Sequence, residues 1–463
     1  MLIFISEYCY SKTVTWYGNH NNNSNWSSGQ NWTLQHQINI GNTTFVANFD
    51  ALFFQGTTRR VSNNDLSAFS FNGITFNSNA GVFTLNGNAI YLNNSVINNS
   101  ANNQNINLSS ITLNATRTIN ASAGNITINS PIQGNGGITK TGVNTLRLNG
   151  NNSYSGATTI SDGIISIGST SAIASTSQVN LGNASTLLYT GGVANITKNI
   201  TVTAGSATVQ NSGSGLLTLS GALSKDGTTL VLNGGTQGID VTGVISGTSA
   251  NSDLDVYGNV TLSAPNTYNG PTTIYSGGNL TAAVANAMGN TTSVVMHNGG
   301  SILVSANSSI NDSASMSMNG STLAFNGDIT ESIGALTLSA NSIIDMSGGI
   351  VRLTFSSLLS ALSSSSQLLI YNYTMNSDAL YFASNANLAE SLQYINFYSD
   401  NGTTLLTDSF IDSQTTPYEV KPFPEPESWF SAGALLLGAG IWMIKKKRAQ
   451  AALSSLVTES RES

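Results

Sequence analysis

Charged residues are scarce in this sequence. Only 8% of its 463 residues are Asp, Glu, Lys or Arg, and the formal net charge is −7, whereas about 25% charged residues is usual. A coiled coil or a long-helix protein is excluded, because either draws roughly half of its residues from Ala, Glu, Lys, Leu and Arg. A nucleic-acid partner is excluded as well, since no basic stripe crosses the main body of the chain.

Cysteine and histidine are also nearly absent. The single cysteine, Cys9, permits neither an internal disulfide nor a cysteine-based zinc site. The three histidines, His20, His36 and His297, are too few and too scattered to form a metal centre, and we expect them in exposed loops. The sequence therefore predicts no metal and no cofactor.

The chain does contain many short apolar runs in which alternate residues are apolar. In the run from Thr145 to Asn149, for example, Leu146 and Leu148 share one face while Arg147 points away. No window keeps a helical period, and Gly-rich turns follow every 8–12 residues or so. The pattern predicts an all-β protein, and by itself it leaves both a sandwich and a stacked solenoid open.

An internal repeat favours the solenoid. Residues 148–160 recur as residues 262–274, with the shared core Asn-x-Tyr-x-Gly-x-Thr-Thr-Ile. A fixed repeat is typical of coils that cannot bury their inward residues alone and must stack on their neighbours. The repeat residues of interest are Tyr154, Gly156, Thr158 and Thr159 in the first copy, and Tyr268, Gly270, Thr272 and Thr273 in the second.

This motif resembles the autotransporter-associated β-strand repeat, also called the passenger-associated transport repeat. The segment Gly136–Gly142, which contains Lys140, matches the strand that precedes the motif in that family, and residues 222–227 match it more weakly. The resemblance implies a right-handed parallel β-helix. With about 20 residues per coil and about 4.8 Å between coils, residues 40–340 would form a rod of roughly 70 Å. We expect Asn and Thr to form ladders along it.

The C-terminus combines three features in a fixed order. A stiff Pro424-Glu425-Pro426 segment comes first, and an uncharged run over 429–444 follows, roughly 24 Å long if helical. The basic cluster Lys445, Lys446, Lys447 and Arg448 comes last. Because positive residues stay on the cytoplasmic side, this order predicts a single transmembrane helix with residues 1–428 outside.

These three parts resemble the PEP-CTERM sorting signal of Gram-negative bacteria. The resemblance implies that an exosortase, a membrane-embedded cysteine transpeptidase, recognises Pro424, Glu425 and Pro426 and processes the tail. The body would then be anchored in the cell envelope first, and would reach the cell surface or the extracellular space after processing.

We therefore expect five parts along the chain. An N-terminal segment and solenoid cap covers 1–40, the β-solenoid 41–340, and a small C-terminal β module 341–420. The sorting signal, with its transmembrane helix at 429–444, covers 421–448, and a cytoplasmic tail covers 449–463. Trp16, Trp26 and Trp32 are candidates for closing the open end of the solenoid, with sugar stacking as the alternative.

A catalytic constellation is hard to find. Asp253 and Asp255 would share one strand face, but neither a base nor a histidine accompanies them in the sequence, so we interpret them as solvated carboxylates. We predict a non-enzymatic surface protein with a structural or adhesive role and extracellular polysaccharide as a possible partner. The alternatives are a polysaccharide lyase or hydrolase on the same β-helix, or a carbohydrate- or ice-binding surface with pieces such as Thr201-Val202-Thr203.

Overall fold

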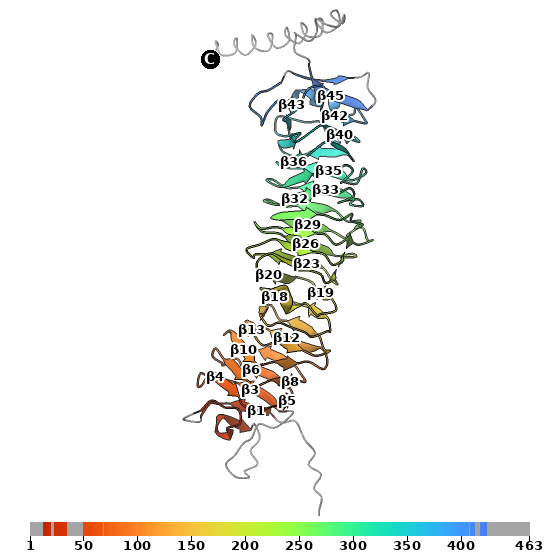
Figure 1. Cartoon of the computed structure of the whole chain (residues 1–463). Helices are drawn as coiled ribbons and strands as arrows, with labels where there is room; N and C mark the ends of the chain where they lie inside the picture. The colour runs from red at the N-terminus through yellow and green to blue at the C-terminus, as the bar shows by residue number, and fades with distance from the viewer. Residues whose placement is uncertain are drawn as a thin grey trace, which may run out of the picture.

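The protein is a long rod of stacked coils (Figure 1). In this computed structural model we describe residues 13–19, 23–34, 50–67, 69–406, 408–412 and 417–423. Each full coil contributes one strand to each of three sides, and strands on the same side pair in parallel with the coil before and after. The prediction of an all-β parallel solenoid is therefore confirmed.

One side of the rod is a single sheet of fourteen strands, which we call sheet 2. It runs without interruption along the solenoid, and its strands are β4 (Val61–Asn64), β7 (Thr84–Gly87), β10 (Gln104–Leu108), β13 (Ile126–Ile128), β16 (Thr145–Leu148), β18 (Gly163–Ile167), β20 (Ser185–Tyr189), β23 (Ser206–Asn211), β26 (Thr229–Asn233), β29 (Leu254–Tyr257), β31 (Thr272–Ile274), β33 (Ser293–Met296), β35 (Ser315–Met318) and β38 (Leu336–Leu338).

A second side is built from two sheets in succession. Sheet 1 has twelve strands: β2 (Trp32–Leu34), β1 (Thr13–Trp16), β3 (Ala51–Phe54), β6 (Ile74–Phe76), β9 (Val96–Asn98), β12 (Arg117–Ala121), β15 (Ile138–Thr141), β17 (Thr158–Ile160), β19 (Val179–Leu181), β22 (Ile200–Val202), β25 (Leu223–Ser224) and β28 (Ile245–Ser246). Further along the chain, sheet 5 has five: β37 (Ile329–Ile333), β40 (Val351–Phe355), β42 (Ala379–Phe382), β45 (Tyr418–Pro422) and β44 (Ser409–Asp412).

The third side is likewise divided into two sheets. Sheet 3 has four strands, β5 (Phe69–Phe71), β8 (Ile90–Leu92), β11 (Ile111–Thr112) and β14 (Ile132–Gln133). Sheet 4 has ten: β21 (Ala194–Ile196), β24 (Leu217–Leu219), β27 (Ile239–Val241), β30 (Asn259–Leu262), β32 (Asn279–Ala282), β34 (Ser301–Val304), β36 (Thr322–Phe325), β39 (Ser342–Asp345), β41 (Leu368–Tyr371) and β43 (Ile395–Phe397).

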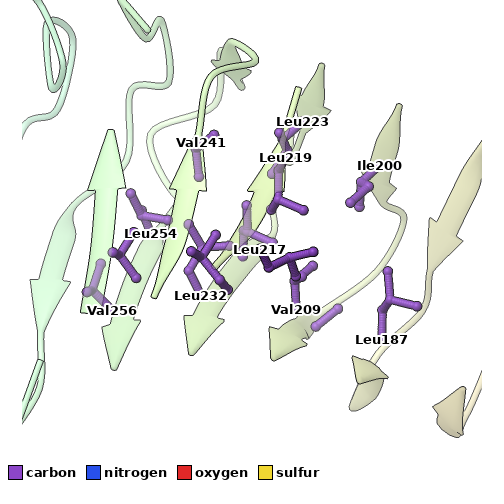
Figure 2. Close-up of a cluster of buried hydrophobic side chains, with 14 of the residues drawn as sticks. Leu187, Ile200, Val209, Leu217, Leu219, Leu223, Leu232, Val241, Leu254 and Val256 are labelled. Atoms are coloured by element: carbon purple, nitrogen blue, oxygen red, sulfur yellow. The ribbon is translucent and has the colours of Figure 1, made fainter. Parts of the chain in front are cut away.

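The alternating apolar pattern places one residue of every two in a continuous core. On sheet 2, for example, Leu187, Val209 and Leu232 stand in register on successive coils, all fully buried. Figure 2 shows these side chains facing those of the other two sides, such as Ile200 and Leu217. Each coil is too thin to bury such residues alone, so burial depends on the coils above and below.

The coils are close in size to the predicted 20 residues. Leu254 pairs with Thr272, eighteen residues later, and Leu230 pairs with Leu254, twenty-four residues later. Fourteen strands at about 4.8 Å give sheet 2 a length of about 60 Å.

Polar ladders run along the outside of the solenoid, as the composition suggested. The Asn107 side-chain amide donates to Asn86 at 3.1 Å, Asn129 donates to Asn107 at 2.6 Å, and Asn149 donates to Asn129 at 2.7 Å. Stacked amides satisfy one another without ions, which explains how a weakly charged surface remains compatible with water.

Helical structure is minor among the described residues. The helices are η1 (Gly29–Asn31), η2 (Thr170–Ala172), α1 (Leu388–Ser391) and η3 (Leu392–Tyr394). Within the part of the chain that the structure describes, no helix has the length and apolar character needed to cross a membrane. The transmembrane helix predicted at 429–444 lies outside that part.

The first coils are closed by aromatic residues. Strand β1 pairs in parallel with β3 on one edge and antiparallel with β2 on the other. Trp16, Trp26 and Trp32 are buried at this end, with Trp16 and Trp32 edge-to-face at 5.0 Å and Trp26 and Trp32 at 6.1 Å. Rings buried in this way are not available to stack on sugars, and they pack against the first coil of the core.

Antiparallel pairing also ends the described solenoid on its C-terminal side. Beyond residue 340 the parallel ladder continues, because β39 pairs with β41, β41 with β43 and β40 with β42. Strands β42 and β44 then pair antiparallel with β45. An antiparallel edge of this kind terminates a parallel stack.

Candidate functional site: the repeat junctions and an aromatic–carboxylate cluster

Two groups of predicted site residues must be distinguished at the outset. The sorting motif Pro424, Glu425 and Pro426 and the basic cluster Lys445 to Arg448 lie outside the described residues. The repeat residues, by contrast, all lie within the described part of the solenoid.

Each repeat is found where one side of the rod lacks a regular strand. On the third side, segments 149–157 and 168–178 fill the gap between the last strand of sheet 3 and the first of sheet 4. On the second side, segments 263–271 and 283–292 lie between sheets 1 and 5. The same motif is therefore used on two different sides of the rod, at the junction between two sheets.

The motif's asparagine replaces part of the missing ladder. The Asn152 carboxamide oxygen accepts from the Ile132 amide at 2.8 Å, and its nitrogen donates to the Ala172 carbonyl at 2.8 Å. In the second copy, Asn266 accepts from the Ile245 amide and donates to the Ala287 carbonyl, both at 2.7 Å. One side chain thus bridges the coil before it and the coil after it, as a strand would.

The motif's tyrosine and first threonine form a buried hydroxyl chain. The Tyr154 and Thr158 hydroxyls are 2.7 Å apart, Thr158 donates to Thr176 at 3.0 Å, and Thr176 donates to the Gly156 carbonyl at 2.7 Å. Burial raises the pKa of Tyr154 to about 12, with the Thr158 hydrogen bond opposing the shift. The phenol is therefore a neutral structural group.

The second copy repeats this chain at nearly the same distances. Tyr268 lies 2.7 Å from Thr272, Thr272 lies 3.0 Å from Thr291, and Thr291 donates to the Gly270 carbonyl at 2.9 Å. Complete burial raises the pKa of Tyr268 well above its ordinary value. The two networks match atom for atom although they face different sides of the rod.

The motif's glycine allows adjacent coils to approach closely. A Cβ atom on Gly156 would lie 2.4 Å from the Gly137 nitrogen, and one on Gly270 would lie 2.2 Å from the Ser252 carbonyl. No side chain fits there without displacing backbone. The second threonines, Thr159 and Thr273, point outward from their strands, so only six of the eight predicted motif residues belong to the buried junctions.

Two buried lysines satisfy corner carbonyls. Lys140 donates to the carbonyls of Thr141 and Asp162, at 2.9 and 3.1 Å, and burial lowers its pKa to about 8, with the Asp162 charge acting against the shift. Lys225 donates to the Ser252 carbonyl and lies 4.0 Å from the centre of the Tyr268 ring. Burial lowers the pKa of Lys225 to about 7, opposed by the charges of two aspartates.

Those aspartates, Asp253 and Asp255, are not the isolated solvated carboxylates that we expected. Strand pairing brings Tyr257, Tyr275 and His297 onto consecutive coils beside them. The two tyrosine rings are parallel with centroids 4.5 Å apart, and the His297 ring stacks on Tyr275 at 5.1 Å. His297 is consequently a partly buried member of a stack rather than an exposed loop residue, which corrects that prediction.

The electrostatics of this cluster are unusual for so weakly charged a chain. Burial, and secondly the neighbouring Asp253, raise the pKa of Asp255, whose carboxylate lies 3.5 Å from the Tyr275 hydroxyl. Burial also raises the pKa of Asp253, and the Lys225 charge opposes that shift. One Asp253 carboxylate oxygen is buried without a hydrogen-bond partner. No described group of three or more acidic, histidine or cysteine side chains has the arrangement of a metal site.

Sequence reasoning missed three buried polar residues. Thr176 and Thr291 complete the hydroxyl chains, and their only signal is a similar spacing after the motif. Glu331 accepts from the Ser309 and Ile310 amides at 2.9 and 3.0 Å, and burial raises its pKa to about 7, with those hydrogen bonds acting against the shift. It satisfies backbone donors where a coil lacks a strand, as the motif asparagines do.

Comparison with known proteins supports the repeat assignment. Residues 138–167 and 258–282 match the passenger-associated-transport-repeat family. A stretch of 109 residues, 23% of this chain, is 36% identical to the adhesin BmaC autotransporter of Brucella suis biovar 1 (strain 1330), of which it spans 3%. No solved structure matches the chain. The chain is thus an all-β parallel solenoid in which two segments match the passenger-associated transport repeat.

Proposed function

We propose that this chain is a non-enzymatic β-helical surface protein with a structural or adhesive role. The observation that carries the proposal is the repeat itself, which occurs twice with the same buried hydrogen bonds and belongs to a family of passenger repeats. The buried residues of the repeat hold adjacent coils together. The similarity to an adhesin over part of the chain supports the same role.

We also propose that the solenoid is right-handed, in keeping with the usual hand of parallel strand connections, and that residues 429–444 form a single transmembrane helix. In this proposal an exosortase-type transpeptidase recognises Pro424, Glu425 and Pro426. Lys445 to Arg448 hold the end of the helix in the cytoplasm. The body lies outside the inner membrane and reaches the cell surface or the extracellular space after processing.

The test is to fractionate expressing cells that possess an exosortase and to determine the mature C-terminus by mass spectrometry. We expect a surface form that has lost its tail. Replacing Pro424 and Glu425 should leave the tail intact and the protein in the membrane, whereas neutralising the basic cluster should release or misorient it. A surface form that still ends at Ser463 would contradict the sorting proposal and leave the segment as an anchor.

A polysaccharide-active enzyme is the second candidate. The specific observation in its favour is the cluster of Asp253, Asp255, Tyr275 and His297, in which burial raises the pKa of both carboxyl groups. A carboxylic acid with a raised pKa suits general acid catalysis. Turnover of pectin, alginate, chitin or glucan that disappears in the Asp253→Asn, Asp255→Asn variant would favour this candidate over the first.

A further inference from the structure

The corner between sheets 2 and 4 carries two parallel columns of side chains. The first column is the aromatic stack of Tyr257, Tyr275 and His297, of which Tyr257 ends β29 and the other two directly follow β31 and β33. All three side chains are partly exposed. Aromatic side chains that reach the surface side by side offer both apolar edges and polar groups to a ligand.

The second column begins a few residues later in each coil, at the start of β30, β32 and β34. Asn279 donates to Asn259 at 2.9 Å, and the Ser301 hydroxyl donates to Asn279 at 2.7 Å. An amide side chain has two N–H donors and two acceptor lone pairs. The ladder uses one donor and one acceptor of Asn279, so one of each remains available to a ligand.

Each turn between the two columns contains glycine. Tyr257 and Asn259 are separated by Gly258 alone, and the next two turns contain Gly277 and Gly299. A Cβ on Gly277 would meet no atom within 4 Å, and one on Gly299 would meet only the Ser276 hydroxyl, at 3.7 Å. The surface strip between the aromatic rings and the amides therefore carries no side chain at Gly258, Gly277 and Gly299.

The charge of the strip selects among ligands. Asp255 lies beside the stack and approaches the Tyr275 hydroxyl at 3.5 Å, while the nearby cation, Lys225, is fully buried. An anionic ligand would meet the Asp255 carboxylate, and the buried Lys225 ammonium would not be accessible to pair with it. The favoured ligand is a neutral one that presents both apolar C–H groups and many hydroxyls.

We propose that this corner binds a neutral β-linked oligosaccharide lying along the rod axis. Sugar rings would contact the edges of the aromatic column, and their hydroxyls would bond with Asn259, Asn279, Ser301 and the tyrosine hydroxyls. Each of the three coils offers one aromatic ring and one polar side chain, Asn or Ser, about every 4.8 Å, which suits a polymer of identical units. This inference deepens the proposed adhesive function and rests on it.

The test is calorimetric titration of the purified full chain with cellohexaose and chitohexaose, with a galacturonate hexamer as the anionic comparison. We expect binding of a neutral hexamer and at least tenfold weaker binding of the galacturonate. Tyr257→Ala combined with Tyr275→Ala should weaken neutral binding at least tenfold. The matched control is Tyr91→Ala, which removes an outward tyrosine of sheet 3 that is 40% exposed and should bind like wild type.

Asn279→Ala covers the possibility that the double variant does not fold, because it removes an exposed amide and leaves the stack in place; we expect at least threefold weaker binding. The proposal would be overturned if the wild-type chain bound neither neutral hexamer. It would also be overturned if the folded tyrosine and Asn279 variants bound as tightly as the wild type. Adhesion of cells displaying each variant separates the two claims. If cells displaying the wild type and cells displaying the tyrosine variant adhere equally, the adhesive function stands and this site is wrong. If cells displaying the wild type do not adhere, the adhesive function itself is wrong.

Discussion

Replacing Thr158 with valine removes the central hydroxyl of the first repeat junction while keeping the shape of the side chain. In the wild type this hydroxyl lies 2.7 Å from the Tyr154 hydroxyl and donates to Thr176 at 3.0 Å, and Thr158 is fully buried. The valine variant leaves the Tyr154 hydroxyl buried without a partner. A buried unsatisfied group costs about 1–3 kcal/mol, so we expect the local free energy of opening to fall by about 2 kcal/mol.

Tyr154→Phe provides the matched comparison. It removes one hydrogen bond but leaves no orphan, because Thr158 still donates to Thr176; the expected loss is about 1 kcal/mol. Combining the two substitutions removes the orphaned hydroxyl, so the double variant should lose less than the sum of the single losses. Such non-additivity is the signature of direct contact.

Native-state hydrogen exchange is the suitable assay, because long solenoids need not unfold in one step. A loss of 2 kcal/mol corresponds to roughly thirtyfold faster exchange of the amides in β17. The second junction is an independent replicate, and Thr272→Val and Tyr268→Phe should behave alike in β31. Exchange unchanged in Thr158→Val, or strictly additive losses, would refute the reasoning.

Three further predictions concern packing, pH and the end of the rod. Gly270→Ala should cost about 1–3 kcal/mol in urea unfolding because its Cβ would overlap the Ser252 backbone, whereas Gly192→Ala, with open space, should be neutral. Burial lowers the pKa of Lys225 from 10.5 to about 7, so between these pH values the unfolded chain binds more protons than the folded chain. The free energy of unfolding should therefore rise from pH 7 to pH 9.5, and it should rise less in the Lys225→Met variant. Trp26→Ala should cost about 3–5 kcal/mol and expose the first coil, with self-association detectable by light scattering; a monomer of wild-type stability would contradict the capping role.

The sequence alone was sufficient for the architecture. A strand side chain points inward or outward with a period of two, so the alternation in segments such as Thr145–Asn149 determines which residues are buried before any tertiary contact is known. The duplicated Asn-x-Tyr-x-Gly-x-Thr-Thr motif then favoured stacked coils over a sandwich. The scarcity of charge likewise pointed to the amide ladders that join Asn86, Asn107 and Asn129.

Only the tertiary structure decided which distant residues meet. From β3 onward, parallel neighbours along the rod axis are 18–27 residues apart in sequence, and the exact register depends on the length of every intervening turn. For that reason the sequence suggested Asp253 and Asp255 as solitary carboxylates, whereas the register brings Tyr275 and His297 beside them. The two copies of the repeat likewise lie on different sides of the rod. The motif determines only its local hydrogen bonds, whereas its position around the rod depends on the lengths of all the coils before it.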